Sequence, residues 1–222
     1  MAQNPNILLY TGKTGPGTPN GRKVSIMLEE LGLPYEIYNL SIPDDEQRSE
    51  WYLKINASGR IPTIIDRTEP DHPVTVTESA AIMLYLESKY GKMEFSYPHG
   101  TTEYWSMMEW IFFQMSNIGP MQGQFNHFNV YAPEKVPYAI HRYKNETLRL
   151  YSIINRHLAQ SSSGWLVGDK CTIADLINFT WIHIAEFSGI KLDEMPEFRP
   201  LAEWRARISA RDGVKKGWAV PS

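Results

Sequence analysis

The spacing of apolar residues changes near residue 92. Before this point, short apolar or alternating runs predict strands, and helical spacing predicts helices between them. The predicted strands are 7–11, 35–40, 60–66 and 74–78, and the predicted helices are 20–32, a short segment within 48–56, and 79–91. Beyond it, the patterns are helical: 102–118 with a continuation to 131 that Pro120 breaks, 137–160, 172–188 and 200–211. The chain is therefore expected to form a small α/β domain followed by an all-α domain.

The predicted order of the first part is β-α-β-α-β-β-α. Strands separated by helices imply a partly parallel sheet, and the closing pair of strands implies an antiparallel edge. We expect the α/β domain to occupy residues 1–92 and the all-α domain to occupy residues 101–222.

The amino-acid composition indicates a folded protein and argues against several classes of partner and site. A hydrophobic content of 42% with 12% aromatic residues supports a packed core. The net charge of −3 is spread along the chain, which argues against nucleic acid or an anionic membrane as the main partner. The single cysteine, Cys171, excludes an internal disulfide and a four-thiolate metal site, and it is expected to be a packed, inert thiol. With no signal peptide and no apolar run of membrane-spanning length, the sequence predicts a cytoplasmic protein without a metal.

The loop "GKTGPGTPNGRK" (12–23) contains Gly-Lys-Thr, a triplet typical of phosphate-binding loops. Such a loop needs a glycine five residues earlier, and that position is Ile7, inside the first strand. The glycine pair Gly12 and Gly17 has the right spacing but is followed by Thr18 instead of lysine. The loop is therefore not predicted to bind a nucleotide.

Two short motifs are candidates for ligand binding. In "GRIPTIID", Pro62 opens a strand, either as an ordinary edge-strand proline or as a point where the backbone of Ile61 is presented to a ligand, a role that a cis Ile61–Pro62 bond would suit. In "VTVTESAAIMLYL", Ser79 either caps its helix or, with Glu78 and the helix amides, binds an α-amino acid head group.

The element order, the Ile-Pro and Glu-Ser motifs and the helical second half together resemble the glutathione transferases, from Ile7 to about Val214. The resemblance implies a thioredoxin-like first domain, in which Ile61 and Pro62 bind the cysteinyl part of glutathione and Glu78 and Ser79 bind its γ-glutamyl end. "LVGDKCTIADL" supports it, because Thr172-Ile173-Ala174-Asp175 forms the structural capping box used by this family.

The segment "TPNGRKV" is similar to that of the fungal nitrogen-regulator-like (Ure-type) and bacterial nu-class transferases, as are "EWIFFQMSNIGPMQGQFNHF" and "APEKVPYAIHRYKNET". In those relatives an Asn or Thr side chain approaches the glutathione sulfur, which points to Asn20, helped by Thr18, as the catalytic residues. At a helix start, Asn20 is also expected to be an N-cap, and the two roles can coexist because the cap leaves the amide nitrogen free. Tyr10, at the end of the first strand, is expected to pack and ranks below both as a catalytic group.

Further residues follow from the resemblance. Arg60 can pair with the glycyl carboxylate, and Gln47 stands where a relative has a glutathione-contacting His. Glu103 either reaches across a homodimer interface to the γ-glutamyl ammonium or is an ordinary solvated helix charge. The kink at Pro120 is expected to direct five side chains toward a co-substrate pocket, unless they merely flank the core: Met121, Gln124, Phe125, His127 and Phe128.

The sequence thus predicts a glutathione transferase with glutathione as co-substrate and disulfide-reductase or peroxidase activity, acting on an electrophile, a disulfide or a peroxide. One alternative is a non-catalytic glutathione-binding regulatory protein of the same fold. The first predicted strand begins only a few residues into the sequence, with no asparagine-rich arm, and this favours the enzyme. Another alternative is a plain conjugating transferase, which would differ only in its substrate.

Overall fold

The computed structural model describes residues 6–12 and 18–220, so residues 13–17 of the glycine-rich loop lie outside the described part. The chain divides into two compact units: Met1–Lys92 with Ala210–Ser222, and Met93–Ser209. The sequence-based division placed residues 210–222 in the helical domain. In the structure, helix α9 (Asp212–Trp218) instead packs on α1 (Pro19–Glu30), where Ser25 Oγ donates to the carbonyl of Gly217 at 2.7 Å.

Within the described residues, the first unit contains a four-stranded mixed sheet in the order β2-β1-β3-β4. Its elements, in chain order, are β1 (Ile7–Gly12), α1, β2 (Tyr35–Leu40), the 3-10 turn η1 (Glu46–Arg48), α2 (Glu50–Leu53), β3 (Thr63–Asp66), β4 (Val74–Thr77), α3 (Ser79–Leu86), the π-helical turn η2 (Glu87–Gly91) and α9. The predicted order of strands and helices is confirmed, and the third strand starts three residues later than expected.

Strand β1 lies at the centre of the sheet, and every one of its residues is buried. It pairs in parallel with β2 and antiparallel with β3, which in turn pairs antiparallel with β4. Strand β3 is therefore an inner strand, so the interpretation of Pro62 as an edge-strand proline is wrong. Pro62 precedes β3 and takes no place in its ladder.

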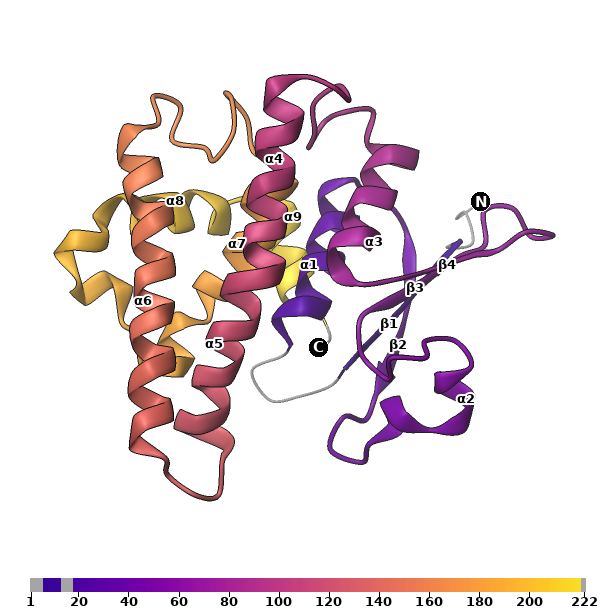
Figure 1. Cartoon of the computed structure of the whole chain (residues 1–222). Helices are drawn as coiled ribbons and strands as arrows, with labels where there is room; N and C mark the ends of the chain where they lie inside the picture. The colour runs from indigo at the N-terminus through magenta and orange to yellow at the C-terminus, as the bar shows by residue number, and fades with distance from the viewer. Residues whose placement is uncertain (1–5, 13–17, 221–222) are drawn as a thin grey trace. The chain divides into compact units, whose positions relative to one another are not determined.

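The two faces of the sheet are covered by different helices (Figure 1). Leu8 and Tyr10 point to one face and pack with Leu40 and Tyr52, the latter from α2. Because side chains alternate along a strand, Leu9 and its partner Ile64 point to the opposite face, where α1 and α3 lie. Both faces are thus buried, which accounts for the uninterrupted apolar character of β1.

The described part of the second unit is helical. Its elements are α4 (Thr102–Phe113), η3 (Gln114–Ile118), α5 (Gly119–Asn126), η4 (His127–Tyr131), α6 (Pro137–Gln160), α7 (Ile173–His183), the 3-10 turns η5 (Ala185–Ser188), η6 (Leu192–Glu194) and η7 (Pro196–Phe198), and α8 (Arg199–Ser209). Helix α7 is buried from Ile173 to Ile182, as expected of a helix surrounded by others. The predicted capping box is present at its start, and Asp175 also accepts a hydrogen bond from Trp204 Nε1 at 2.9 Å.

The segment 102–131 is helical throughout, and its predicted break takes the form of a change in helical pitch. The π-helical turn η3 ends immediately before Gly119 and Pro120, which begin α5. Pro120 has no N–H to donate to a carbonyl of the preceding turn, so the regular helical hydrogen bonding is interrupted at this point.

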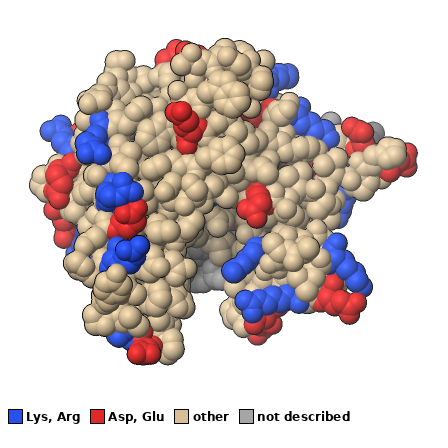
Figure 2. All heavy atoms as spheres, viewed as in Figure 1, with Lys and Arg blue, Asp and Glu red and all other residues tan. Residues whose placement is uncertain are grey.

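Charged side chains of both signs are interspersed on the face drawn in Figure 2. Several form exposed ion pairs within one helix, such as Arg149 with Glu146 in α6. Across residues 6–12 and 18–220, no helix combines the length and the apolar character needed to cross a membrane. Over those same residues, we find no group of three or more His, Cys, Asp or Glu side chains placed to hold a metal ion.

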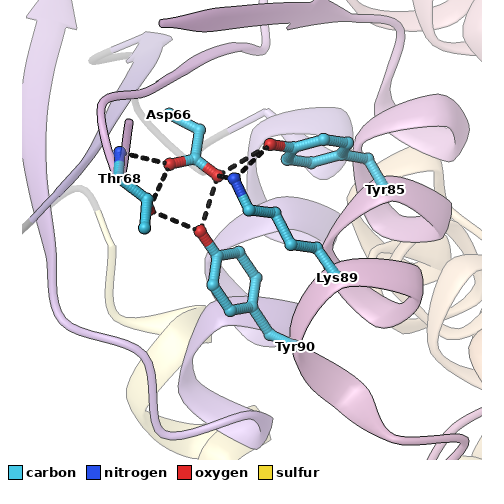
Figure 3. A network of polar contacts seen from close by, with 5 residues as sticks. All are labelled: Asp66, Thr68, Tyr85, Lys89 and Tyr90. Atoms are coloured by element: carbon cyan, nitrogen blue, oxygen red, sulfur yellow. Dashed lines mark hydrogen bonds and ion pairs between the residues drawn. The ribbon is translucent and has the colours of Figure 1, made fainter. Parts of the chain in front are cut away.

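A buried carboxylate, Asp66, anchors one end of β3 (Figure 3). Its Oδ1 accepts hydrogen bonds from the backbone and hydroxyl of Thr68, and its Oδ2 accepts from Tyr85, Tyr90 and Lys89. Burial alone would raise the pKa of Asp66, but these hydrogen bonds outweigh burial and hold the pKa well below its usual value. The network connects β3 to α3 and η2.

Candidate functional site

The strand register brings the predicted ligand-binding segments to one end of the sheet. Tyr10 of β1 pairs with Thr63 of β3, and Thr63 pairs with Thr77 of β4. Pro62 directly precedes Thr63 and Glu78 directly follows Thr77, while α1 begins a few residues after β1 ends. Neighbouring strands lie about 4.8 Å apart, so these segments adjoin one another, although they are up to sixty residues apart in the sequence. The Asp66 network lies at the opposite end, because Asp66 pairs with Ile7 and Val74.

Thr18 and Asn20 occupy the first turn of α1. Thr18 is the N-cap and Pro19 the first helical residue, so Asn20 is the second helical residue and the N-cap interpretation of Asn20 is wrong. The Thr18 hydroxyl makes no cap hydrogen bond, and its Oγ1 is buried without a hydrogen-bond partner among the described residues. A buried hydroxyl left in this state costs free energy unless a ligand or water satisfies it.

Gly21 allows α1 to approach β1 closely. A Cβ atom at this position would lie 3.0 Å from Thr18 Oγ1 and would overlap Thr11 Oγ1. The glycine therefore sets the distance between the end of β1 and the first turn of α1, where Thr18 and Asn20 lie.

The side chains of Tyr52 and Asn56 fix the position of the segment from Arg60 to Thr63 through hydrogen bonds. The Arg60 carbonyl accepts from Tyr52 Oη at 2.8 Å and from Asn56 Nδ2 at 2.9 Å. The same two side chains contact Thr63 Oγ1. The Ile61–Pro62 bond is cis, the geometry that would suit presentation of the Ile61 backbone to a ligand. The Arg60 side chain is exposed, so it is accessible to an anionic ligand.

Glu78 and Ser79 form the junction between β4 and α3. Glu78 is exposed and has φ 66° and ψ 119°, a conformation that non-glycine residues rarely adopt and that often accompanies functional sites. Ser79 is the first residue of α3, and the N-cap is Glu78, so the interpretation of Ser79 as the helix cap is wrong. Ser79 is buried, and its Oγ accepts a hydrogen bond from Lys23 Nζ at 3.3 Å.

Gln47 lies in η1 and is 8% exposed. Its Nε2 donates to Asp45 Oδ1 at 3.0 Å, while its Oε1 is buried with no hydrogen-bond partner in the described part of the chain. The amide is therefore held in place, and its role as a ligand contact stays a prediction.

Glu103 lies in the first turn of α4, exposed, in the helical unit. It lines a cavity of about 530 Å³ together with Glu109, Trp110 and His157. The His157 ring is 4.8 Å from the Trp110 ring, and its Nε2 is 2.8 Å from the carbonyl of Leu166. The predicted reach of Glu103 across a dimer interface stays a prediction.

The five residues predicted for a co-substrate pocket are distributed over α5 and η4 in different environments. Phe125 is 2% exposed and belongs to the core. Met121 lines a second cavity of about 530 Å³ beside Arg142 of α6. Gln124 and His127 are exposed, and Phe128 stacks on Tyr143 with ring centroids 5.8 Å apart. Their predicted pocket role therefore stays a prediction, with Phe125 the least accessible of the five.

Tyr10 packs as expected. Its ring lies 5.4 Å from Tyr38, 6.2 Å from Trp51 and 5.6 Å from Tyr52.

Sequence reasoning missed Tyr52, Asn56 and Lys23. For Lys23 a signal was available, because it lies four residues before Met27 on the apolar stripe of α1. For Tyr52 and Asn56 no periodic signal exists, since their partners are backbone and hydroxyl groups of a later segment.

Two family models match the chain. "Glutathione S-transferase, N-terminal domain" matches residues 18–89, and "Glutathione S-transferase, C-terminal domain" matches residues 125–217. The disulfide-bond oxidoreductase YfcG of Escherichia coli (strain K12) is 37% identical over 196 residues, which cover 87% of each chain.

Solved structures agree with this similarity. A glutathione transferase homologue from Lodderomyces elongisporus, crystallised with two glutathione molecules per subunit, has a TM-score of 0.91 and 38% identity, covering 97% of this chain and 99% of its own. The glutathione transferase URE2P6 from Phanerochaete chrysosporium, in complex with oxidized glutathione, has a TM-score of 0.88 and 40% identity, with coverage of 98% and 97%. These findings confirm the predicted fold, a thioredoxin-like unit and a helical unit. The chain therefore belongs to the glutathione S-transferase family, and its relatives include Ure2-type transferases.

Proposed function

We propose that this protein is a glutathione-dependent disulfide reductase with peroxidase activity, in which Asn20 and Thr18 stabilise the glutathione thiolate. Glutathione S-transferases use glutathione as co-substrate. The single observation that carries the proposal is the buried Thr18 hydroxyl without a described partner, at the start of α1 and at the sheet end where the other candidate segments meet.

Each segment at this end of the sheet suits one part of glutathione. The N-terminus of α3 with Ser79 suits the γ-glutamyl carboxylate, and the exposed Glu78 suits its ammonium group. The backbone of Ile61 suits the cysteinyl part, and Arg60, with Gln47, suits the glycyl carboxylate. This arrangement directs the thiol toward the first turn of α1.

Interactions at the first turn of α1 can supply the free energy that thiolate formation requires. A thiol with pKa about 8.5 is only a few per cent ionised at neutral pH, and lowering its pKa by about two units requires roughly 2.7 kcal/mol. A hydrogen bond from the Asn20 amide to the anion supplies about 1.5–3 kcal/mol. The N-terminus of α1 adds about 0.3–1 kcal/mol, and the Thr18 hydroxyl is a further donor. No side-chain acid or base of the protein is required.

The chemistry then proceeds by thiol–disulfide exchange. The glutathione thiolate attacks one sulfur of a disulfide, forms a mixed disulfide and releases the other sulfur as a thiolate. A second glutathione attacks the mixed disulfide, so glutathione disulfide leaves and the substrate is fully reduced. With a peroxide, the first attack yields a sulfenic acid on glutathione and an alcohol or water, and the second glutathione again gives glutathione disulfide with loss of water.

The names of relatives favour the redox branch. YfcG is named a disulfide-bond oxidoreductase, and the URE2P6 structure contains oxidized glutathione. This chemistry requires a pool of reduced thiol, which is consistent with a cytoplasmic enzyme that keeps its one cysteine buried. We expect a homodimer, in which Glu103 contacts the glutathione of the partner subunit.

The test is glutathione-dependent reduction of a small mixed disulfide, measured beside conjugation of a chloronitroarene in the same buffer. Strong disulfide turnover with weak conjugation supports the proposal, and the reverse identifies a conjugating transferase. Glutathione binding with neither activity identifies a regulatory binding protein.

The role of Asn20 is tested with Asn20→Ala. Turnover should fall by about 10- to 100-fold, the equivalent of one charge-assisted hydrogen bond, with little change in glutathione affinity. The pKa of bound glutathione, followed by thiolate absorbance, should rise in the variant. The exposed Asn6, at the opposite end of β1 from the candidate site, provides the matched control, Asn6→Ala, which should leave both quantities unchanged. Unchanged turnover in Asn20→Ala removes this residue from the mechanism.

A further inference from the structure

Lys23 is a lysine buried inside the first unit. It lies on α1, three residues after Asn20, and only 1% of its surface is exposed. Its neighbours along the helix, Val24 and Met27, are also fully buried. Its Nζ donates a hydrogen bond to Ser79 Oγ, 56 residues later in the chain, at 3.3 Å. The side chain therefore joins α1, which carries the proposed thiolate site, to the first residue of α3.

Burial of this amino group is costly, which argues for a function. Lysines are almost never fully buried without a partner, and burial lowers the pKa of Lys23 well below its usual value, while the negative charge of Glu78 acts in the opposite direction. A methionine of similar length would fill the same space without the cost of desolvating an ammonium group. Packing alone therefore does not explain a lysine at this position.

The hydrogen bond to Ser79 determines which way the serine hydroxyl points. A protonated lysine has three donors and no acceptor, whereas a serine hydroxyl has one proton and two acceptor lone pairs. When Lys23 donates to Ser79 Oγ, the Ser79 proton points away from Lys23, toward an acceptor on another side of the hydroxyl. A carboxylate is such an acceptor, and its negative charge in turn favours the protonated form of Lys23.

A carboxylate is also the group that the rest of this junction accommodates. The first amides of α3 have no intrahelical acceptor, and the partial positive charge at the helix N-terminus favours an anion. Glu78, with its positive φ, makes the turn from β4 into the helix immediately before Ser79. Lys23 thus lies behind Ser79, on the buried side of the position where an anion would bind.

We propose that Lys23 is a positioning residue for the α-carboxylate of the γ-glutamyl group: it orients the Ser79 hydroxyl as a donor to that carboxylate and places a positive charge behind it. This inference rests on the proposed binding of glutathione at Ser79. It assigns recognition of the carboxylate to a pair of residues, one of which does not touch the ligand. Stabilisation of the glutathione thiolate remains the proposed role of Asn20 and Thr18.

The test compares two ligands in a double-mutant cycle. The variants are Lys23→Met, Ser79→Ala and the double variant. The ligands are glutathione and 4-aminobutanoyl-cysteinylglycine, which is glutathione without the α-carboxylate. Dissociation constants are measured by calorimetry. Each single substitution should weaken glutathione binding by about tenfold or more, since a hydrogen bond to a charged group is lost. The double variant should be within about threefold of the weaker single variant, because the two residues act through one contact.

The analogue separates a positioning role from a structural one. Its binding should change by less than about threefold in any variant, because it lacks the group that the pair recognises. Equal weakening of both ligands by Lys23→Met would overturn the inference, and so would additive effects in the double variant. The matched control is Ser25→Ala, which removes a buried polar contact from the same helix on the side facing α9 and should leave both affinities unchanged.

The outcomes also separate this inference from the proposed function. If the wild-type protein binds no glutathione, the proposed function fails. If it binds glutathione and Ser79→Ala weakens binding while folded Lys23→Met does not, the inference alone fails. Should Lys23→Met not fold, Lys23→Gln replaces it in the cycle. This variant keeps an N–H donor without the charge, and it should lose less affinity than Ser79→Ala while still distinguishing the two ligands.

Discussion

Replacement of Asp66 by Asn is expected to destabilise the first unit strongly. The Asp66 side chain is fully buried, and its Oδ2 accepts from Tyr85 Oη at 2.7 Å, from Tyr90 Oη at 2.6 Å and from Lys89 Nζ at 3.0 Å. An Asn amide offers one acceptor oxygen and an NH2 group. Either the Thr68 donors or the three donors at Oδ2 would then face other donors (Figure 3).

The expected loss follows from the geometry. Removing one partner of a buried ion pair costs about 3–5 kcal/mol. Lys89 is 27% exposed, so water recovers part of its hydration, and the remaining Asn oxygen keeps some hydrogen bonds. We therefore expect a loss of about 2–4 kcal/mol in the free energy of unfolding, which is a large part of the 5–15 kcal/mol typical of a folded protein.

The effect of this substitution should depend on pH. Because the pKa of Asp66 is lower in the folded state than in the unfolded state, its contribution is fully present above the unfolded pKa of about 3.9 and is lost as the pH falls toward the folded pKa. The difference between wild type and Asp66→Asn should therefore shrink by about 1 kcal/mol between pH 5 and pH 3.

Urea denaturation at several pH values, followed by circular dichroism, measures these quantities. Asp71→Asn, in the exposed turn after β3, is the matched control and should change stability by less than about 0.5 kcal/mol at every pH. A stability difference for Asp66→Asn that stays constant from pH 5 to pH 3 would refute the assignment of a depressed pKa to this carboxylate. A loss below about 1 kcal/mol at pH 7 would refute the energetic role of the network.

Three further substitutions test other parts of the structure. Gly21→Ala should lower kcat/KM for glutathione by about tenfold or more, because its Cβ displaces Thr18 and the first turn of α1, and steady-state kinetics beside a thermal melt would show whether activity falls more than stability. Gly217→Ala should destabilise the first unit by about 1–3 kcal/mol, since its Cβ would overlap the backbone of Ile26, and a normal melting curve would contradict the packing of α9 on α1. Asp175→Asn should cost about 2–4 kcal/mol through loss of the capping box, seen as a lower urea midpoint of the helical unit.

Apolar periodicity and turn residues predicted the order of the elements. The buried run of β1 and the helical spacing of α1 each encode their element locally. The Thr172–Asp175 box also follows from four adjacent residues. These features depend on neighbours in the sequence, so one sequence suffices to predict them.

The sequence-based predictions were wrong where two local rules competed, or where the answer depended on the order of the strands in the sheet. Asn and Thr are both good N-caps, and Pro19 decides between them because proline favours the first helical position, which makes Thr18 the cap. A proline that opens a segment is typical of an edge strand, one of the two interpretations of Pro62, but the neighbours of β3, strands β1 and β4, are specified by the whole sheet. The attachment of α9 to α1 likewise depends on Gly217 meeting the backbone of Ile26, which no periodicity encodes.

The buried polar groups were the hardest to predict, and they divide the first unit into two functional regions. At one end of the sheet, Lys23 and Asn56 hold Ser79 and Arg60, the residues proposed to contact glutathione. At the other end, Asp66 holds β3 to α3, away from these residues. Substitution of Asp66 should thus lower stability with little effect on ligand discrimination, whereas substitution of Lys23 should alter discrimination between glutathione and its decarboxylated analogue. Since both ends share strand β3 and helix α3, separate effects would show that polar contacts, and not the common apolar core, determine how this unit recognises its ligand.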